Sequence, residues 1–269
     1  MKESMYRIGA ILYRHLFYFK KPFEIFHYWY WILIDIMIFG FLGKSISQTA
    51  VASNSTSVMQ AHILFANLAL LYGFLRANTT VGVALLRDLW DANFVALFST
   101  PLRKTEWVIA LAILAGICGV VSFSIGTFLV WLIFGFWVFS FGWTVLLALG
   151  LLLLAGMIVG FLMTALLLWL GKQANPLVWA ASWLFVPISG VFYSIDVLPS
   201  VMRSIPAYNP LYHIFSFVRI TATGVAGFWT QVGVAAALLG VYGVCVAFVL
   251  SRAFTSACKK GLTRLEVEM

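Results

Sequence analysis

Long apolar runs alternate along this chain with short segments that carry most of its charge. The longest run, residues 107–171, contains no Asp, Glu, Lys or Arg in 65 residues. As one α-helix it would extend about 100 Å, whereas the hydrocarbon core of a bilayer is about 30 Å thick. The run must therefore fold back on itself. The same reasoning along the whole chain predicts six membrane spans, at about 23–43, 60–85, 105–137, 143–170, 176–194 and 229–252.

The first 22 residues carry basic side chains at a helical spacing. Arg7, Arg14 and Lys21 recur every seven residues and share one side of a helix, while the apolar residues lie on another. This pattern predicts an amphipathic helix over residues 1–22 that lies along the membrane interface. A cleavable signal peptide would instead show a basic start and then an unbroken apolar core.

A second amphipathic segment, residues 86–97, separates the second and third spans. Read as a helix, it places Trp90 and Phe94 on an apolar face and Arg87, Asp88 and Asp91 on a charged one. We expect it to lie along the membrane surface.

Residues 195–227 form a third kind of connection. The segment is interrupted by Pro199, Pro206 and Pro210, which argues against a single span, yet it is too apolar for an ordinary loop. It predicts two short helices that dip into the outer leaflet, where protein covers their broken backbone.

These elements together predict an all-α integral membrane protein. Its parts are the interfacial helix of residues 1–22, a six-span domain of residues 23–253 and a basic tail of residues 254–269.

Composition supports a membrane protein and excludes a soluble one. Of the 269 residues, 63% are hydrophobic and 10% are charged, and the mean hydropathy is +1.00. A water-soluble globule could not cover so much apolar surface.

The net charge of +8 is explained by the orientation of the chain in the membrane rather than by nucleic-acid binding. With a cytoplasmic N-terminus, thirteen Lys and Arg residues fall in the cytoplasmic segments and three, Lys44, Arg203 and Arg219, fall outside. Such an excess is the positive-inside pattern, and it predicts that both termini are cytoplasmic.

The sequence offers no catalytic, cofactor or metal motif. The three cysteines lack C-x-x-C spacing and the four histidines are scattered. The G-K-S at residues 43–45 resembles the end of a phosphate-binding loop, but Ile38 stands where the first glycine belongs. We therefore expect neither an enzyme nor a chain that binds a cofactor or metal.

Two ionisable residues lie within predicted spans. Asp35 and Arg76 are each roughly ten residues from a cytoplasmic span end, or about 15 Å deep. An unpaired charge at that depth costs about 2.5 to 3.5 kcal/mol even on insertion scales. We expect the two residues to pair or to line a wet pathway.

Two stretches carry a resemblance to a known family. The first is "DLWDANFVALFSTPLRKTEW" at residues 88–107, and the second is "SGVFYSIDVLPSVMRSIPAYNPLYHIFSFVR" at residues 189–219. With six predicted spans between an interfacial helix and a basic tail, the chain resembles the permease subunit of type 2 ATP-binding-cassette (ABC) exporters. The sequence departs from the family pattern in two places: Ser194 replaces a common proline, and residues 216–217 lack an acidic residue before Arg219.

The resemblance implies a division of labour between subunits. Residues 86–98 would be the coupling helix that docks on a separate nucleotide-binding subunit, seated by Trp90, Asp91 and Phe94, with Arg87 and Asp88 in rim ion pairs. Two ATPase subunits would bind ATP and magnesium. Two permease chains, identical or homologous, would surround the pathway.

The resemblance also implies an outer gate and a location. Residues 195–227 would form the gate as two re-entrant helices, at about 197–205 and 209–219. The gate residues would be Tyr193, Pro199, Pro206, Pro210 and Arg219. The cargo would be a lipid-linked glycan, a glycolipid or a hydrophobic drug, exported across a bacterial plasma (inner) membrane.

Two other classes of function compete with this interpretation. One is a self-sufficient secondary transporter or channel that uses Asp35 and Arg76. It would leave the amphipathic segment of residues 86–97 unexplained. The other is a membrane enzyme acting on lipid, but the nine acidic residues are too dispersed to form an evident catalytic cluster.

Overall fold

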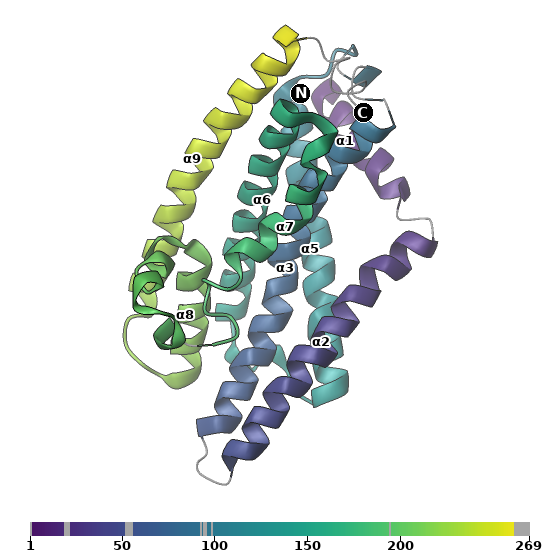
Figure 1. Cartoon of the computed structure of the whole chain (residues 1–269). Helices are drawn as coiled ribbons and strands as arrows, with labels where there is room; N and C mark the ends of the chain where they lie inside the picture. Colours follow the sequence, from purple (N-terminus) through teal and green to yellow (C-terminus); the bar gives the residue numbers. More distant parts are fainter. Residues whose placement is uncertain are drawn as a thin grey trace.

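The computed structural model describes residues 2–18, 22–51, 56–91, 93, 96–97, 99–193 and 195–260. Regular structure in this part of the chain is helical (Figure 1). Four of the helices are long and apolar enough to cross a membrane, which indicates a multi-pass membrane protein. They are α3 (Thr56–Trp90), α5 (Lys104–Phe134), α6 (Thr144–Leu170) and α9 (Phe228–Lys260).

The centre of the bundle is α3, which packs along both α5 and α6. Its contact with α6 is backbone to backbone, because Gly156 and Gly160 face it. A Cβ atom on Gly156 would lie 2.6 Å from the carbonyl oxygen of Phe74, and one on Gly160 would lie 2.8 Å from that of Asn78. Small residues four apart allow such close approach of membrane helices.

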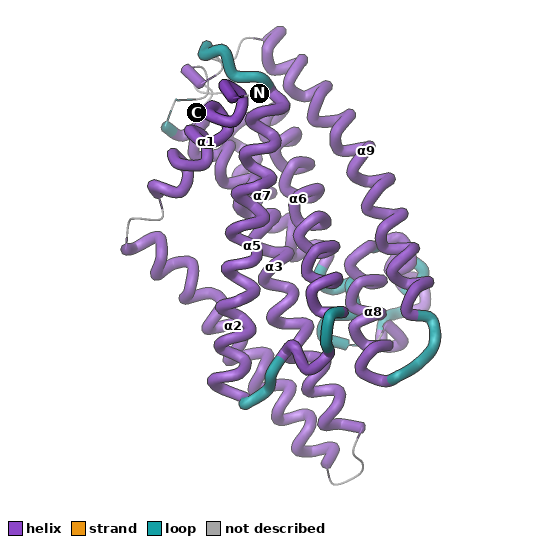
Figure 2. Tube along the Cα trace, turned by 180° about the vertical axis from the view of Figure 1, so that it is seen from behind, coloured by secondary structure: helices purple, strands orange, loops and turns teal. Residues whose placement is uncertain are grey.

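The remaining helices surround this centre unevenly. The long α2 (Pro22–Val51) packs on α3 and α5, and α9 packs against α6 and α8 (Pro210–Thr223). The start of α1 (Lys2–Tyr18) and the end of α9 lie at one end of the molecule, called here the terminal end (Figure 1). The end of α2 and the start of α3 lie at the opposite end (Figure 1). Seen from behind, the loops gather near the two ends and beside α8 (Figure 2).

The expected span at residues 176–194 is not one continuous helix. Its helical part, α7 (Asn175–Phe185), has 11 residues and is about 16 Å long, too short to cross a bilayer. Pro187 lacks an N–H to continue the helix, and Gly190 turns the chain at a φ of +67°.

The segment after α7 is only half as predicted. The second short helix is present as α8, but the first, expected at 197–205, is replaced by three short 3₁₀ turns: η3 (Ile195–Val197), η4 (Ser200–Met202) and η5 (Ile205–Tyr208). Pro199 and Pro206 divide this stretch because neither can donate the hydrogen bond of a continuous helix.

Boundaries at the terminal end also differ from expectation. Residues 86–90 are not part of a separate helix, since α3 continues to Trp90 and a turn follows at Asp91. The expected tail begins as helix, because α9 runs to Lys260 with Phe254 and Ala257 buried in the core. Residues 261–269 lie outside the described part.

Candidate functional site

Two buried carboxylates at the terminal end of the bundle are neutralised by the N-terminal helix α1 (Lys2–Tyr18). Asp88 near the end of α3 and Glu106 near the start of α5 are 4% and 3% exposed. Arg14 lies 2.6 Å from the Oδ1 atom of Asp88, and Arg7 lies 3.1 Å from the Oε1 atom of Glu106. The basic side of α1 therefore faces the bundle. The sequence predicted that this helix would lie along the interface, without these contacts.

Glu106 connects three segments of chain. Besides Arg7, its carboxylate accepts hydrogen bonds from the Ser4 hydroxyl at 2.8 Å and from the backbone N–H of Arg103 at 3.0 Å. The second bond joins the carboxylate of the third helical residue to the backbone N–H of the N-cap, which is one of the two bonds of a capping box. Arg7 also donates to the carbonyl oxygen of Pro101 at 3.1 Å. The start of α1 is thus fixed to the start of α5.

Asp88 depends on one partner. Arg14 donates to its Oδ1 atom, while its Oδ2 atom is buried without a hydrogen-bond partner among the described residues. His15, next to Arg14, is also buried. Burial, followed by the positive charges of Arg14 and Arg87, lowers the pKa of His15 to about 4, so its imidazole is neutral at pH 7.

Beside this cluster, the end of α3 presents the side chains expected to dock an ATPase. Trp90 is 50% exposed although it is large and apolar, and Asp91 is exposed in the turn that follows. Arg87 is partly buried. Phe94 lies outside the described residues. Asp88 is the exception, because its pairing with Arg14 removes it from the exposed rim where an intermolecular ion pair was expected.

The two charges predicted within spans are placed differently from one another. Asp35 on α2 accepts a hydrogen bond of 2.6 Å from the hydroxyl of Tyr72 on α3. Arg76 lies one helical turn beyond Tyr72 on the same helix and is partly buried. Pairing of Asp35 with Arg76 stays a prediction.

The residues expected to form an outer gate hold the segment between α7 and α8 in place. Tyr193 donates to the carbonyl oxygen of Pro187 at 2.6 Å, and Arg219 on α8 donates to that of Gly190 at 2.7 Å. Arg219 therefore connects α8 to the turn at Gly190. A role in gating is not tested by these contacts.

The three prolines of this segment begin helical turns. Pro199 is the N-cap of η4, and Pro206 and Pro210 lie in the first turns of η5 and α8. There the missing N–H of proline has no helical partner to lose. Asn209 caps α8, accepting a hydrogen bond from the backbone N–H of Leu211 at 3.1 Å.

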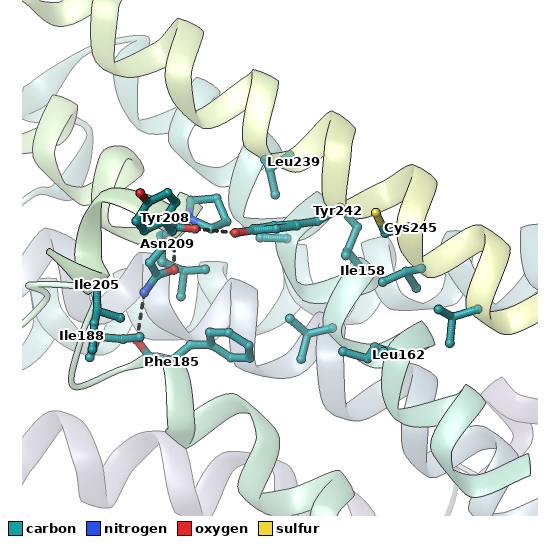
Figure 3. A pocket seen from close by; sticks show the side chains of 16 residues that line it. Ile158, Leu162, Phe185, Ile188, Ile205, Tyr208, Asn209, Leu239, Tyr242 and Cys245 are labelled. Atoms are coloured by element: carbon teal, nitrogen blue, oxygen red, sulfur yellow. Dashed lines mark hydrogen bonds between the residues drawn. The ribbon is translucent and has the colours of Figure 1, made fainter. Parts of the chain in front are cut away.

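An apolar cavity of about 440 Å³ lies between α6, α8 and α9 (Figure 3). Side chains reach it from all three helices and from the end of α7. Within the described residues, no group of three or more His, Cys, Asp and Glu side chains could hold a metal ion.

The sequence did not identify the cluster around Asp88 and Glu106 or the cavity. A signal for the cluster was present, since acidic residues are few and Asp88 and Glu106 flank apolar runs while Arg7 and Arg14 recur at a helical spacing. A buried carboxylate requires a counter-charge. The cavity has no comparable signal, because its lining comes from separated helices and consists mostly of ordinary apolar residues.

Comparison with protein-family models gave no match for this chain, and comparison with curated protein sequences gave none either.

Proposed function

We propose that this chain is the membrane subunit of an ABC type 2 exporter, driven by a separate ATPase. The observation that carries the proposal is the exposed pair Trp90 and Asp91 at the end of α3. Trp is enriched among the residues that anchor protein interfaces, and an exposed Trp at a helix end is available to a partner. The sequence resemblance assigns this place to the coupling helix.

The course of α3 supports transmission of force from that anchor. The helix has 35 residues and extends about 50 Å without interruption, and it contacts α2, α5, α6 and α7. A rigid-body displacement at Trp90 would therefore move the centre of the bundle. In this proposal ATP and magnesium bind to two copies of the partner subunit, and two permease chains enclose the pathway.

The test is reconstitution with an ATPase subunit in proteoliposomes. We expect the chain to co-purify with the ATPase and to stimulate its hydrolysis. Trp90→Ala and Asp91→Ala should each lower the stimulation while the bundle stays folded, since loss of an interface anchor weakens binding by about 2 kcal/mol, roughly thirtyfold. Phe128→Ala, an exposed aromatic on α5, is the matched control.

Transport without any nucleotide or partner would contradict the proposal. It would favour the alternative of a self-sufficient secondary transporter or channel. One observation favours that alternative, namely the hydrogen bond between Asp35 and Tyr72, one turn from Arg76. In that case Asp35→Asn should abolish transport and Trp90→Ala should not affect it.

The cargo class follows from the same resemblance: a lipid-linked glycan, a glycolipid or a hydrophobic drug. Transport assays with one member of each class would distinguish them.

A further inference from the structure

We propose that the cavity between α6, α8 and α9 binds the alkyl chain of a lipid or lipid-like amphiphile at the depth of the membrane midplane. The proposal concerns binding to the chain itself and does not depend on the exporter function.

The first argument is the depth of the cavity. Its lining on α6 runs from Ala155 to Leu162, around the middle of that helix. On α9 it runs from Leu239 to Val249, again around the middle. Both helices are long enough to span a bilayer. A cavity at mid-helix therefore lies among the ends of lipid tails, where water is scarce and alkyl chains are abundant.

The second argument is shape. The lining residues of α9 recur at 239, 242, 245, 246 and 249, which places them on one face over about 15 Å of helix. Residues 155, 158, 159 and 162 form the opposing face on α6. The cavity is thus elongated along the helices. Its volume of about 440 Å³ lies in the range of small-molecule sites, roughly 300–1,000 Å³.

The third argument is the state of its polar groups. Among the sixteen described residues that line the cavity, none is charged. Tyr242 donates its hydroxyl to the carbonyl oxygen of Tyr208 at 2.7 Å, and Asn209 donates to that of Phe185 at 3.3 Å (Figure 3). Because these two groups are engaged and no lining residue is charged, the lining favours an apolar body.

The fourth argument is access from the membrane. Cys245 lines the cavity and is also exposed on the outer surface of α9. Neighbouring residues on the same helix, Val241, Val244 and Phe248, are exposed as well. A chain can therefore enter from the surrounding lipid near Cys245. The segment from Ile205 to Leu211 lines the other side of the cavity.

The experiment is photo-crosslinking of the full chain in lipid nanodiscs. One probe is palmitic acid with a diazirine in its chain, and the other is a phosphatidylcholine with the same group in one acyl chain. We expect adducts on the peptides that contain residues 155–162 and 239–249. Adducts from the phosphatidylcholine identify the source as bilayer lipid, and adducts from the fatty acid alone identify it as a free amphiphile.

Two tryptophan variants make the test specific. Val246→Trp fills the cavity, whereas Val244→Trp places the same bulk on the exposed face of α9. Loss of burial for a few methylene groups should reduce the adducts about tenfold in Val246→Trp and leave them unchanged in Val244→Trp. Equal adducts in both variants, or adducts spread over all lipid-facing helices, would overturn the proposal.

If Val246→Trp does not fold, a competition experiment on the wild-type chain still tests the proposal. Excess unlabelled palmitic acid should displace the probe from residues 155–162 and 239–249, while cholesterol, which is rigid and wide, should not. Equal competition by both compounds would show that the cavity does not select alkyl chains.

Discussion

At the scale of single residues, the ion pair of Arg14 and Asp88 attaches α1 to the bundle. Asp88 is nearly inaccessible, with a side-chain exposure of 6%, while that of Arg14 is 32%. Since the other carboxylate oxygen of Asp88 has no hydrogen-bond partner among the described residues, the charge relies on Arg14. Removal of one partner of a buried pair costs more than removal of both.

Arg14→Ala should therefore lower the free energy of unfolding by about 3 kcal/mol, the low end for a broken buried pair, because Arg14 is partly exposed. The double variant Arg14→Ala with Asp88→Asn should regain much of this loss. Denaturant unfolding in detergent micelles of these two variants and of Asp88→Asn would complete a double-mutant cycle. Strictly additive losses would mean that the two residues do not interact.

His15 makes the attachment of α1 sensitive to acid. Its pKa in the folded state, about 4, lies below its usual 6.5 because of burial and then the charges of Arg14 and Arg87. The unfolded state thus takes up the proton first, and stability present above pH 6.5 is lost as the pH falls from 6.5 toward 4. For this one proton, the equilibrium constant for packing of α1 on the bundle can fall by up to about tenfold per pH unit.

We expect hydrogen exchange of residues 2–18 to accelerate between pH 7 and pH 5 after correction for intrinsic rates. The variant His15→Gln keeps Asp88 and Glu106 but cannot take up this proton, so its exchange should change much less over that range. The same acceleration in His15→Gln would contradict a role of His15 in this acid sensitivity.

At the scale of elements, α3 and α6 pack closely because α6 has glycines, which lack a side chain, at their contact. Gly156 and Gly160 stand four residues apart and meet the backbone of α3. Gly150, on the same helix, has no atom within 4 Å of a Cβ position. The three glycines look alike in sequence and differ only in what lies opposite them.

Gly156→Ala or Gly160→Ala should thus destabilise the bundle by about 1 to 3 kcal/mol, the usual cost of overpacking. Gly150→Ala should be neutral or stabilising by up to about 1 kcal/mol, since Ala favours helix over Gly. Thermal unfolding of the purified chain would separate these outcomes. Equal effects at all three positions would show that helix propensity, and not packing, governs this contact.

At the scale of the whole molecule, helix ends that the charge pattern assigns to the cytoplasm lie at the same end of the structure. At one end lie the start of α1, the end of α3, the start of α5 and the end of α9 (Figure 1). Val225, between α8 and α9, lies at the other end of α9 from Cys258. The positive-inside pattern predicts that the terminal end is cytoplasmic.

A chain that keeps Cys258 and has Cys118 and Cys245 replaced by Ala should not react with a membrane-impermeant maleimide in sealed right-side-out vesicles. It should react after permeabilisation. A cysteine-free chain with Val225→Cys should react in both states. Both positions are exposed in the structure, so the difference reports sidedness. The reverse pattern would invert the predicted topology.

Much of the helical layout was predictable from the sequence because it depends on local composition. The starts expected at residues 105, 143 and 229 lie within one residue of α5, α6 and α9, since apolar runs bounded by charge, Pro or Gly determine where such helices begin. The predictions were wrong where a proline sits in an apolar stretch. For α7 and the 3₁₀ turns before α8, apolarity indicated a longer helix than the backbone could form.

The sequence by itself determined that the chain is helical and apolar enough for a membrane, because apolarity and charge are read along the chain one residue at a time. Only the tertiary structure decided that Asp88 pairs with Arg14, that Gly156 meets Phe74 and that a cavity remains between α6 and α9. Each of these depends on residues about 75 or more positions apart, or on the angle between two helices. Helical periodicity gives the face on which a side chain lies, and only packing gives the partner that it meets.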